Sequence, residues 1–234
     1  MKKTVLWFFC ILISFGLNAQ SIIGAWEQYH TSEAGENMKS VLIVSDKYSA
    51  LTTYNSDTGE FISSKGGSWE LKDNILTQKM EFNSSMPENV GTEISFKVAI
   101  SDSIFEMDGT KMKRIDNGTP GELQGAWLMS GRTVDGITEM RDTNTPRKTM
   151  KILSGTRFQW IAYNTETKQF IATGGGTYTT KDGIYTETIA FFSRDITKVG
   201  LQLNFDYKLN NGNWHHSGFS TKGDPIDEVW SKRN

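Results

Sequence analysis

The chain has 234 residues, a formal net charge of −2, a single cysteine and an aromatic content of 12%. This charge balance, without any run of Lys and Arg, argues against a nucleic-acid partner. The cysteine is Cys10, so the rest of the chain can form neither a disulfide nor a thiolate metal site. A chain of this length can bury enough apolar surface to fold as one or two domains without cross-links.

The N-terminus has the three parts of a secretory signal peptide, which we predict at residues 1–19. Two lysines precede an apolar stretch from Val5 to Phe15, and Ala19 offers a small residue for cleavage. This stretch is too short to span a bilayer comfortably, and no long apolar run follows it, so we expect no membrane span. A retained anchor is one alternative, and lipoprotein processing is another, disfavoured because Cys10 lies inside the apolar stretch. Export without disulfides predicts a secreted or periplasmic bacterial protein.

The remainder of the chain contains the same unit twice. The stretch FISSKGGSWELKDNILTQ in the first half matches FIATGGGTYTTKDGIYTE in the second at an offset of 109 residues. A repeat of this length indicates two domains rather than a solenoid. The connecting sequence DNGTPGE is rich in turn-forming residues. We therefore predict a first domain at residues 20–116, a linker at 117–121 and a second domain at 122–234.

Alternating apolar and polar residues predict β-strands throughout both units, as in residues 92–100 and 201–209. In the second unit we expect eight strands, beginning near Trp127, Lys148, Phe158, Phe170, Ile184, Leu201, Trp214 and Asp227. Short connections rich in turn residues favour an up-and-down meander that closes on itself. The predicted fold is all-β, with two tandem up-and-down antiparallel barrels of about eight strands each. A β-sandwich with the same strand count is the alternative.

Each unit begins with Gly-Ala-Trp and ends with a basic residue. The motifs are Gly24-Ala25-Trp26 with Arg114, and Gly125-Ala126-Trp127 with Arg233. This pattern resembles the lipocalins and related calycin barrels, and more narrowly the lipocalin-like domains of uncharacterised secreted bacterial proteins. The resemblance implies that Trp26 and Trp127 form the barrel floors and that Arg114 and Arg233 pack over their rings. The units are shorter than a typical lipocalin, so a small cavity is expected.

The second unit has more aromatic residues and is the one we expect to bind a ligand. The expected ligand-binding residues are Trp160, Tyr185, Glu187, Phe205, Tyr207 and Trp214. Glu187 falls at the repeat position of Gln78, so a polar group recurs within an apolar strand face. A buried carboxylate is costly unless it is hydrogen-bonded. Glu187 is therefore expected either to orient the polar end of a ligand or to bond a neighbouring Tyr or Ser.

Motifs for catalysis, cofactors and metals are missing from the sequence. We find no Gly-x-Ser-x-Gly, His-Glu-x-x-His or phosphate loop, and we predict no catalytic residue, metal or cofactor. His215 and His216 are adjacent on a strand and point to opposite faces, so we expect surface or rim positions for the histidines. A haem pocket around His216 is a weaker alternative. The run Gly174–Gly176 is expected to form a bulge at a barrel corner.

These observations predict an exported, non-catalytic binding protein for a small, partly hydrophobic molecule. The alternative is a protein-interaction or inhibitor module whose barrels are filled and hold no small-molecule ligand. An enzyme ranks third. An open cavity would favour the first function and a filled barrel the second.

Overall fold

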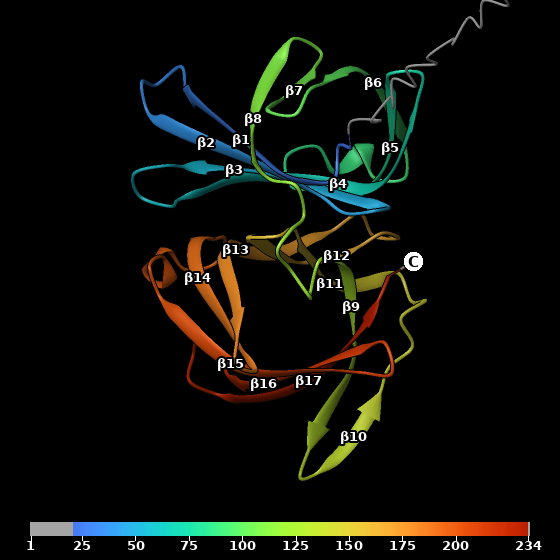
Figure 1. The fold of residues 1–234 in the computed structure, drawn as a ribbon, viewed down its shortest axis with the longest axis vertical. Coiled ribbons are helices and arrows are strands. Elements are labelled where there is room, and N and C mark those ends of the chain that lie inside the picture. Colours follow the sequence, from blue (N-terminus) through green and yellow to red (C-terminus); the bar gives the residue numbers. More distant parts are fainter. Residues whose placement is uncertain (1–20, 234) are drawn as a thin grey trace, which may run out of the picture.

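The computed structural model describes residues 21–233, so the predicted signal peptide at residues 1–19 lies outside the described part of the chain. Residues 21–233 fold into two closed antiparallel β-barrels, one above the other in Figure 1. Each strand of a barrel pairs with its neighbour in sequence, and the last strand closes on the first. This is the predicted all-β, up-and-down arrangement. Within residues 21–233 there is no helix with the length and hydrophobicity needed to cross a membrane.

The first barrel contains eight strands and one short 3-10 helix. In chain order these are β1 (Gly24–Thr31), β2 (Asn37–Val44), β3 (Tyr48–Asn55), β4 (Phe61–Lys72), β5 (Ile75–Asn83), η1 (Pro87–Asn89), β6 (Glu93–Ile100), β7 (Ile104–Met107) and β8 (Thr110–Asp116). Strand β8 pairs with β1 and closes the barrel.

The second barrel repeats this order with one additional strand. Its elements are β9 (Gly125–Val134), β10 (Ile137–Met140), β11 (Arg147–Leu153), β12 (Arg157–Asn164), β13 (Phe170–Lys181), β14 (Ile184–Phe192), η2 (Ile196–Lys198), β15 (Gln202–Asn210), β16 (Asn213–Phe219) and β17 (Pro225–Lys232). Pairing of β9 with β17 closes the barrel.

Strand β10 is the element that the sequence reading missed. It forms a hairpin with the end of β9 that projects from the second barrel in Figure 1. The turn is Asp135-Gly136, and both residues have positive φ, as two-residue hairpin turns require. Eight extra residues lie here, because the repeat offset changes from 101 at Trp26 and Trp127 to 109 further along.

The glycine runs form the expected bulges. The register of β13 and β14 shifts between Gly175 and Gly176, and β4 and β5 shift at the equivalent Gly66 and Gly67. A Cβ atom on Gly176 would lie 2.0 Å from the carbonyl oxygen of Thr188. Only glycine permits this approach, and the bulges let the long strands bend around the barrel.

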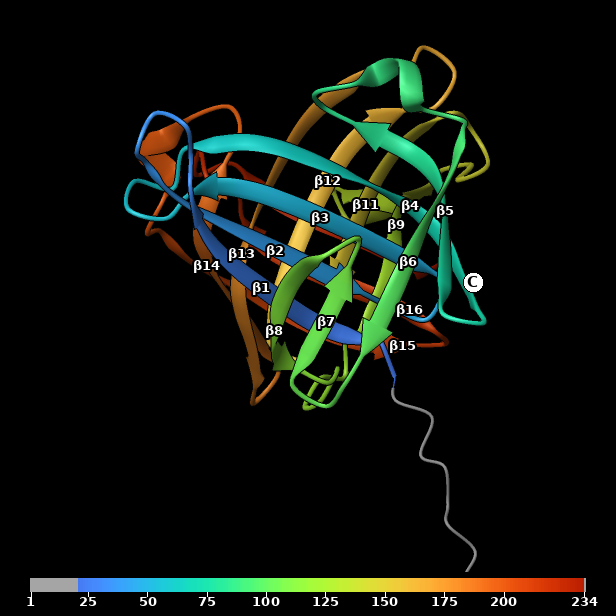
Figure 2. The same cartoon turned by 90° about the horizontal axis from the view of Figure 1, so that it is seen from above.

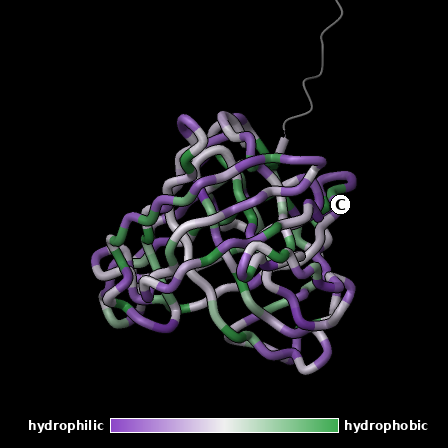
Figure 3. Tube along the Cα trace, turned by 90° about the horizontal axis from the view of Figure 1, so that it is seen from below, coloured by the Kyte–Doolittle hydropathy of each residue, from purple (hydrophilic) through white to green (hydrophobic). Residues whose placement is uncertain are grey.

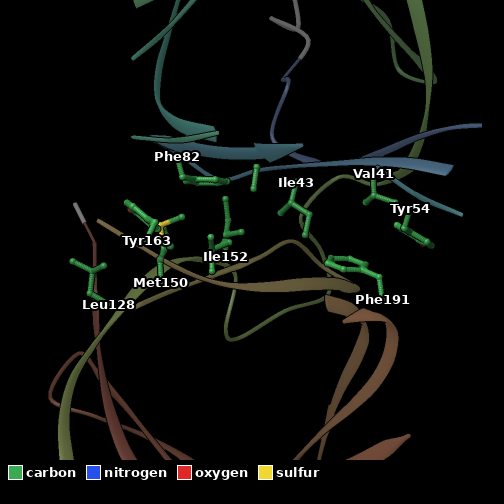
Figure 4. Close-up of a cluster of buried hydrophobic side chains, with 12 residues drawn as sticks. Val41, Ile43, Tyr54, Phe82, Leu128, Met150, Ile152, Tyr163 and Phe191 are labelled. Atoms are coloured by element: carbon green, nitrogen blue, oxygen red, sulfur yellow. The ribbon is translucent and has the colours of Figure 1, made fainter. Parts of the chain in front are cut away.

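The alternation of hydrophobic and hydrophilic residues follows the strands of both barrels (Figure 3). It places one apolar cluster inside each barrel and a third cluster between them. In Figure 2, β2 and β3 cross over β11 and β12 where the barrels meet. The buried members of the shared cluster are Val41, Ile43, Ala50, Tyr54, Phe82, Ala126, Leu128, Met150, Ile152, Ile161, Tyr163 and Phe191, shown in Figure 4. An apolar contact of this kind favours a fixed arrangement of the two barrels.

The two tryptophan floors share one geometry. Trp26 and Trp127 are both buried, and each indole nitrogen donates a 2.8 Å hydrogen bond to the carbonyl oxygen four residues earlier, that of Ile22 or Leu123. The Arg114 guanidinium lies 3.8 Å from the Trp26 ring centre. This is the arrangement that the resemblance implied for the first unit.

The basic partner implied for the second floor was assigned wrongly. Trp127 pairs across the strands with Lys232, whose ammonium lies 5.8 Å from the ring centre. A bulge between Val229 and Trp230 sets this register. A shift of one residue reverses which face a side chain occupies. Arg233 therefore points out of the barrel, lies 4.0 Å from the Tyr48 ring centre and forms two 2.8 Å contacts with Glu81 across the interface.

Candidate functional site

The interior of the second barrel contains a group of buried polar side chains surrounded by aromatic rings. Inward-facing positions of β11, β14, β15, β16 and β17 contribute these residues. They include four of the predicted ligand-binding residues, Tyr185, Glu187, Phe205 and Trp214, which are all at most 4% exposed. We call this group the polar cluster and add to it Lys151, His216 and Trp230, which the sequence reading did not place at the site.

An ion pair lies at the centre of the polar cluster. The Lys151 ammonium is 2.8 Å from a Glu187 carboxylate oxygen, and both side chains are at most 6% exposed. The Tyr185 hydroxyl donates a 2.8 Å hydrogen bond to the same oxygen. Glu187 thus has the hydrogen-bond partners that a buried carboxylate needs. One of its donors is a tyrosine, which was the second of the two roles expected for Glu187 from the sequence.

Aromatic rings surround the Lys151 ammonium. Its distances to the ring centres are 5.0 Å for Trp214, 5.1 Å for Tyr185, 5.3 Å for Trp230 and 5.7 Å for Phe205. Ring faces attract a cation, and the attraction strengthens when water is excluded. The rings and Glu187 together compensate the burial of this charge.

The surroundings shift two titrations in the cluster. Burial raises the pKa of Tyr185 well above its ordinary value, and the Glu187 charge adds to the effect, so this hydroxyl stays protonated and donates. Burial lowers the pKa of His216 from 6.5 to about 4, with a further contribution from the Lys151 charge. At neutral pH His216 is therefore an uncharged imidazole with one donor and one acceptor nitrogen.

Four buried nitrogen atoms in the cluster have no hydrogen-bond partner among the described residues. They are both ring nitrogens of His216 and the indole nitrogens of Trp214 and Trp230. The nearest carboxylate oxygen of Glu228 is 3.8 Å from His216 Nδ1, which is too long for a hydrogen bond. Leaving a buried donor or acceptor unpaired costs about 1–3 kcal/mol. Such a concentration of unused hydrogen-bonding capacity marks the cluster as the candidate site.

The equivalent positions of the first barrel are largely apolar. At the repeat offset of 109, Lys151, Tyr185, Glu187 and His216 correspond to Leu42, Leu76, Gln78 and Met107. Gln78 donates a 2.7 Å hydrogen bond to Ser49 and lines a cavity of about 20 Å³ inside the first barrel. A cavity of this size holds about one water molecule. A barrel of this fold can therefore fill its interior without buried charges.

The other two predicted ligand-binding residues lie at the margin of the cluster. Trp160 is half-buried and packs against Phe192, with ring centres 5.6 Å apart. Tyr207 is also half-buried, and its hydroxyl donates a 2.9 Å hydrogen bond to Glu122. Both face the same interior, and Trp160 is the cross-strand neighbour of Lys151.

The expectation of surface or rim positions is wrong for His216, which is 2% exposed and lies 4.1 Å from Phe205 between ring centres. His30 is exposed and His215 is half-buried. No group of three or more His, Cys, Asp or Glu side chains within residues 21–233 is placed to hold a metal ion.

The protein therefore consists of two antiparallel barrels in tandem. The interior of the second barrel contains the polar cluster. Residues 122–234, a range that contains the second barrel, match the model of a family described as a domain of unknown function (DUF4488). No curated protein matches the chain.

Proposed function

We propose that the protein is an exported, lipocalin-like, non-catalytic binding protein, and that its second barrel holds a small, partly hydrophobic ligand. The observation that carries the proposal is the set of unpartnered nitrogens on His216, Trp214 and Trp230. An indole nitrogen can only donate a hydrogen bond. The Lys151 ammonium can donate three hydrogen bonds and uses one of them for Glu187. The unused capacity is therefore mostly donor capacity, which a ligand acceptor atom would satisfy.

The charge balance of the cluster favours an uncharged acceptor. Lys151 is neutralised by Glu187, and Glu228 is 3.3 Å from the Arg132 guanidinium. A ligand carboxylate would add an uncompensated negative charge to a buried site, which is costly. A carbonyl, ether or hydroxyl oxygen on a compact hydrophobic frame fits better. A cationic ligand group does not fit beside Glu187, because Lys151 already occupies that place.

The rings around the cluster are closely spaced, with centres 4.1–6.4 Å apart. Binding therefore involves ring displacement, and we expect a change in the near-ultraviolet circular dichroism of the tryptophans. A ligand limited to a single ring fits this requirement better than an extended chain, because it displaces fewer side chains.

The test is a screen of cyclic ketones and lactams alongside the corresponding hydrocarbons, followed by tryptophan fluorescence and thermal melting. We expect an oxygen-bearing compound to bind and its hydrocarbon to bind at least ten times more weakly. Lys151→Met should abolish binding, whereas the matched change Leu42→Met in the first barrel should leave it intact. Equal binding by both variants would exclude the polar cluster as the site.

A second candidate function is a protein-interaction module. Two observations favour it. The closely packed rings fill the second interior, which is the outcome expected above for this function. The β9–β10 hairpin also exposes Val134, Ile137 and Met140, each at least 57% accessible. Exposed apolar side chains grouped on a projecting element are typical of interaction sites. A variant with all three changed to Ser should keep its small-molecule binding but lose any protein partner, which separates the two functions.

A further inference from the structure

A cavity of about 100 Å³ lies between the two barrels, outside the polar cluster. Its apolar walls come from both barrels, and Figure 4 shows Val41, Ile43 and Tyr54 of the first barrel facing Phe191 of the second. The Tyr54 and Phe191 rings are stacked with centres 5.1 Å apart. Ligand sites are common at such junctions between domains.

Two cations and a tyrosine also line the cavity. Lys39 and Arg157 both line it, one from each barrel. Tyr54 is 7% exposed, and its hydroxyl makes no hydrogen bond within residues 21–233 but is not fully shut off from solvent. The cavity therefore combines apolar walls with hydrogen-bond donors.

The two cations differ in how they are already used. The Lys39 ammonium is 2.8 Å from Glu27 and 2.8 Å from the Tyr29 hydroxyl. Arg157 donates only to the carbonyl and hydroxyl oxygens of its neighbour Thr156, at 3.3 Å and 2.9 Å. Within residues 21–233 no carboxylate lies within 4.0 Å of the Arg157 guanidinium.

Asp116, which shares the Thr156 hydroxyl with Arg157, has its own hydrogen-bond partners. The Asp116 carboxylate accepts hydrogen bonds from Ser154, Gly155 and Thr156 instead, at 2.6–3.0 Å. Burial raises the pKa of Tyr54, while the charges of Lys39 and Arg157 act in the opposite direction. Both cations and the hydroxyl line this one cavity.

We propose that this cavity is a binding site for a short aliphatic carboxylate. The carboxylate receives hydrogen bonds from Arg157 and the Tyr54 hydroxyl, and the hydrocarbon chain lies against Val41, Ile43 and Phe191. An arginine with free donors is suited to bidentate binding of a carboxylate. A cavity of about 150 Å³ holds benzene, so about 100 Å³ suits an acid of roughly two to four carbons, which has no more non-hydrogen atoms than benzene.

Such a ligand would touch both barrels at once. It would bind the assembled pair and not the separated barrels, so it should raise the melting temperature in proportion to the logarithm of its concentration. This site and the polar cluster are chemically different, because the first is suited to an anion and the second to an uncharged acceptor.

The experiment measures melting and isothermal titration with acetate, propionate and butyrate, and with butyramide as the uncharged control. We expect the carboxylates to bind and butyramide to bind at least tenfold more weakly. Arg157→Gln should weaken carboxylate binding at least tenfold and Tyr54→Phe severalfold. Arg194→Gln, which removes an exposed cation elsewhere on the second barrel, should have no effect.

Two results would overturn the proposal. One is equal affinity for butyrate and butyramide, which would mean that charge is not recognised. The other is unchanged binding in both Arg157→Gln and Tyr54→Phe, with folding checked by near-ultraviolet circular dichroism. The triple variant Lys151→Leu, Glu187→Gln, His216→Met removes the buried ion pair as a whole and serves as a further control: loss of butyrate binding in this variant, once shown to be folded, would assign the acid to the polar cluster and contradict the proposal.

Discussion

The two barrels share their strand order, their glycine bulges and their tryptophan floors, yet their interiors differ in chemistry. The first is closed mainly by aliphatic side chains around the neutral pair of Gln78 and Ser49. The second holds the Lys151–Glu187 ion pair and the imidazole of His216 at equivalent depth. The same scaffold is therefore compatible with either interior.

This difference indicates that the polar cluster is not there for stability. Replacing a buried ion pair by well-packed apolar residues is often neutral or stabilising, and the first barrel shows how this fold accommodates Leu42 and Met107 at those positions. The unpartnered nitrogens add a further cost. A costly interior in one of two otherwise similar barrels is expected where that interior binds something.

The largest expected effect tests what the barrels share. Trp26→Ala and Trp127→Ala should each destabilise the protein by about 3–5 kcal/mol, because each removes a large buried ring and an indole hydrogen bond. Urea unfolding of both variants gives the comparison. An unchanged midpoint for either variant would show that its tryptophan does not form a floor.

A second comparison removes the polar residue that recurs in both interiors. Glu187→Leu leaves the Lys151 ammonium buried without its partner and should cost about 3–5 kcal/mol. Gln78→Leu breaks one neutral hydrogen bond and should cost about 1 kcal/mol. The measurement is the free energy of unfolding in urea at pH 7. Equal losses would contradict the view that only the second interior depends on a charge pair.

The third prediction concerns pH. The pKa of His216 falls from 6.5 to about 4 on folding, so the unfolded chain binds more protons than the folded chain between these values. This contribution should lower stability as pH falls from 6.5 to 4, by about 3 kcal/mol in total. His216→Met should flatten the decline, and the exposed His30→Gln should not. Parallel stability profiles for His216→Met and the wild type would contradict a buried neutral imidazole.

The fourth prediction converts one interior into the other. The triple variant Lys151→Leu, Glu187→Gln, His216→Met carries the first-barrel residues at these positions. We expect it to be more stable than the wild type by about 2 kcal/mol and to lose binding of any ligand of the polar cluster. Differential scanning calorimetry and the ketone screen provide both measurements. A large destabilisation would mean that the cluster is required for folding.

The smallest expected effect distinguishes the two floor cations. Arg114 covers Trp26 and also donates to the carbonyl oxygens of Ser21 and Ile23, so Arg114→Met should cost about 1 kcal/mol. Lys232 is farther from Trp127, and Lys232→Met should cost less than about 0.5 kcal/mol. Thermal melting at low salt resolves the difference. The reverse order would assign the stronger ring contact to Lys232.

The sequence was sufficient for the barrels but not for the contents of the second interior. Alternation and the constant offset predicted the strands, the bulges and the inward direction of Glu187. The same alternation misleads at β11, where Met150 and Ile152 are apolar because they face the other barrel, so Lys151 is the side chain that points inward. Where one barrel packs on the other, the outer face of a strand is apolar and is easily mistaken for the face that points into the barrel. A single sequence does not show where such a contact lies.

The same barrel contact explains why Arg233 was misplaced. The sequence motif paired Arg233 with Trp127. Only the pairing of β17 with β9 shows that Lys232, and not Arg233, lies opposite Trp127. The partner that Arg233 has instead, Glu81, is 152 residues away in the chain. A short motif in one repeat carries no information about contacts with the other repeat.

The carboxylate of Asp116 ends the first barrel and is hydrogen-bonded to the β11–β12 turn of the second. Together with the apolar interface, these contacts lead us to expect that the halves stay together when a peptide bond within residues 117–121 is cut. Segments 20–116 and 122–234, produced as separate polypeptides and mixed, should elute as one particle on size-exclusion chromatography. Cleavage of the linker by a protease should leave this elution volume unchanged under native conditions. Asp116→Ala should weaken that reassembly. The tandem repeat would then behave as a heterodimer whose subunits happen to be encoded in one chain.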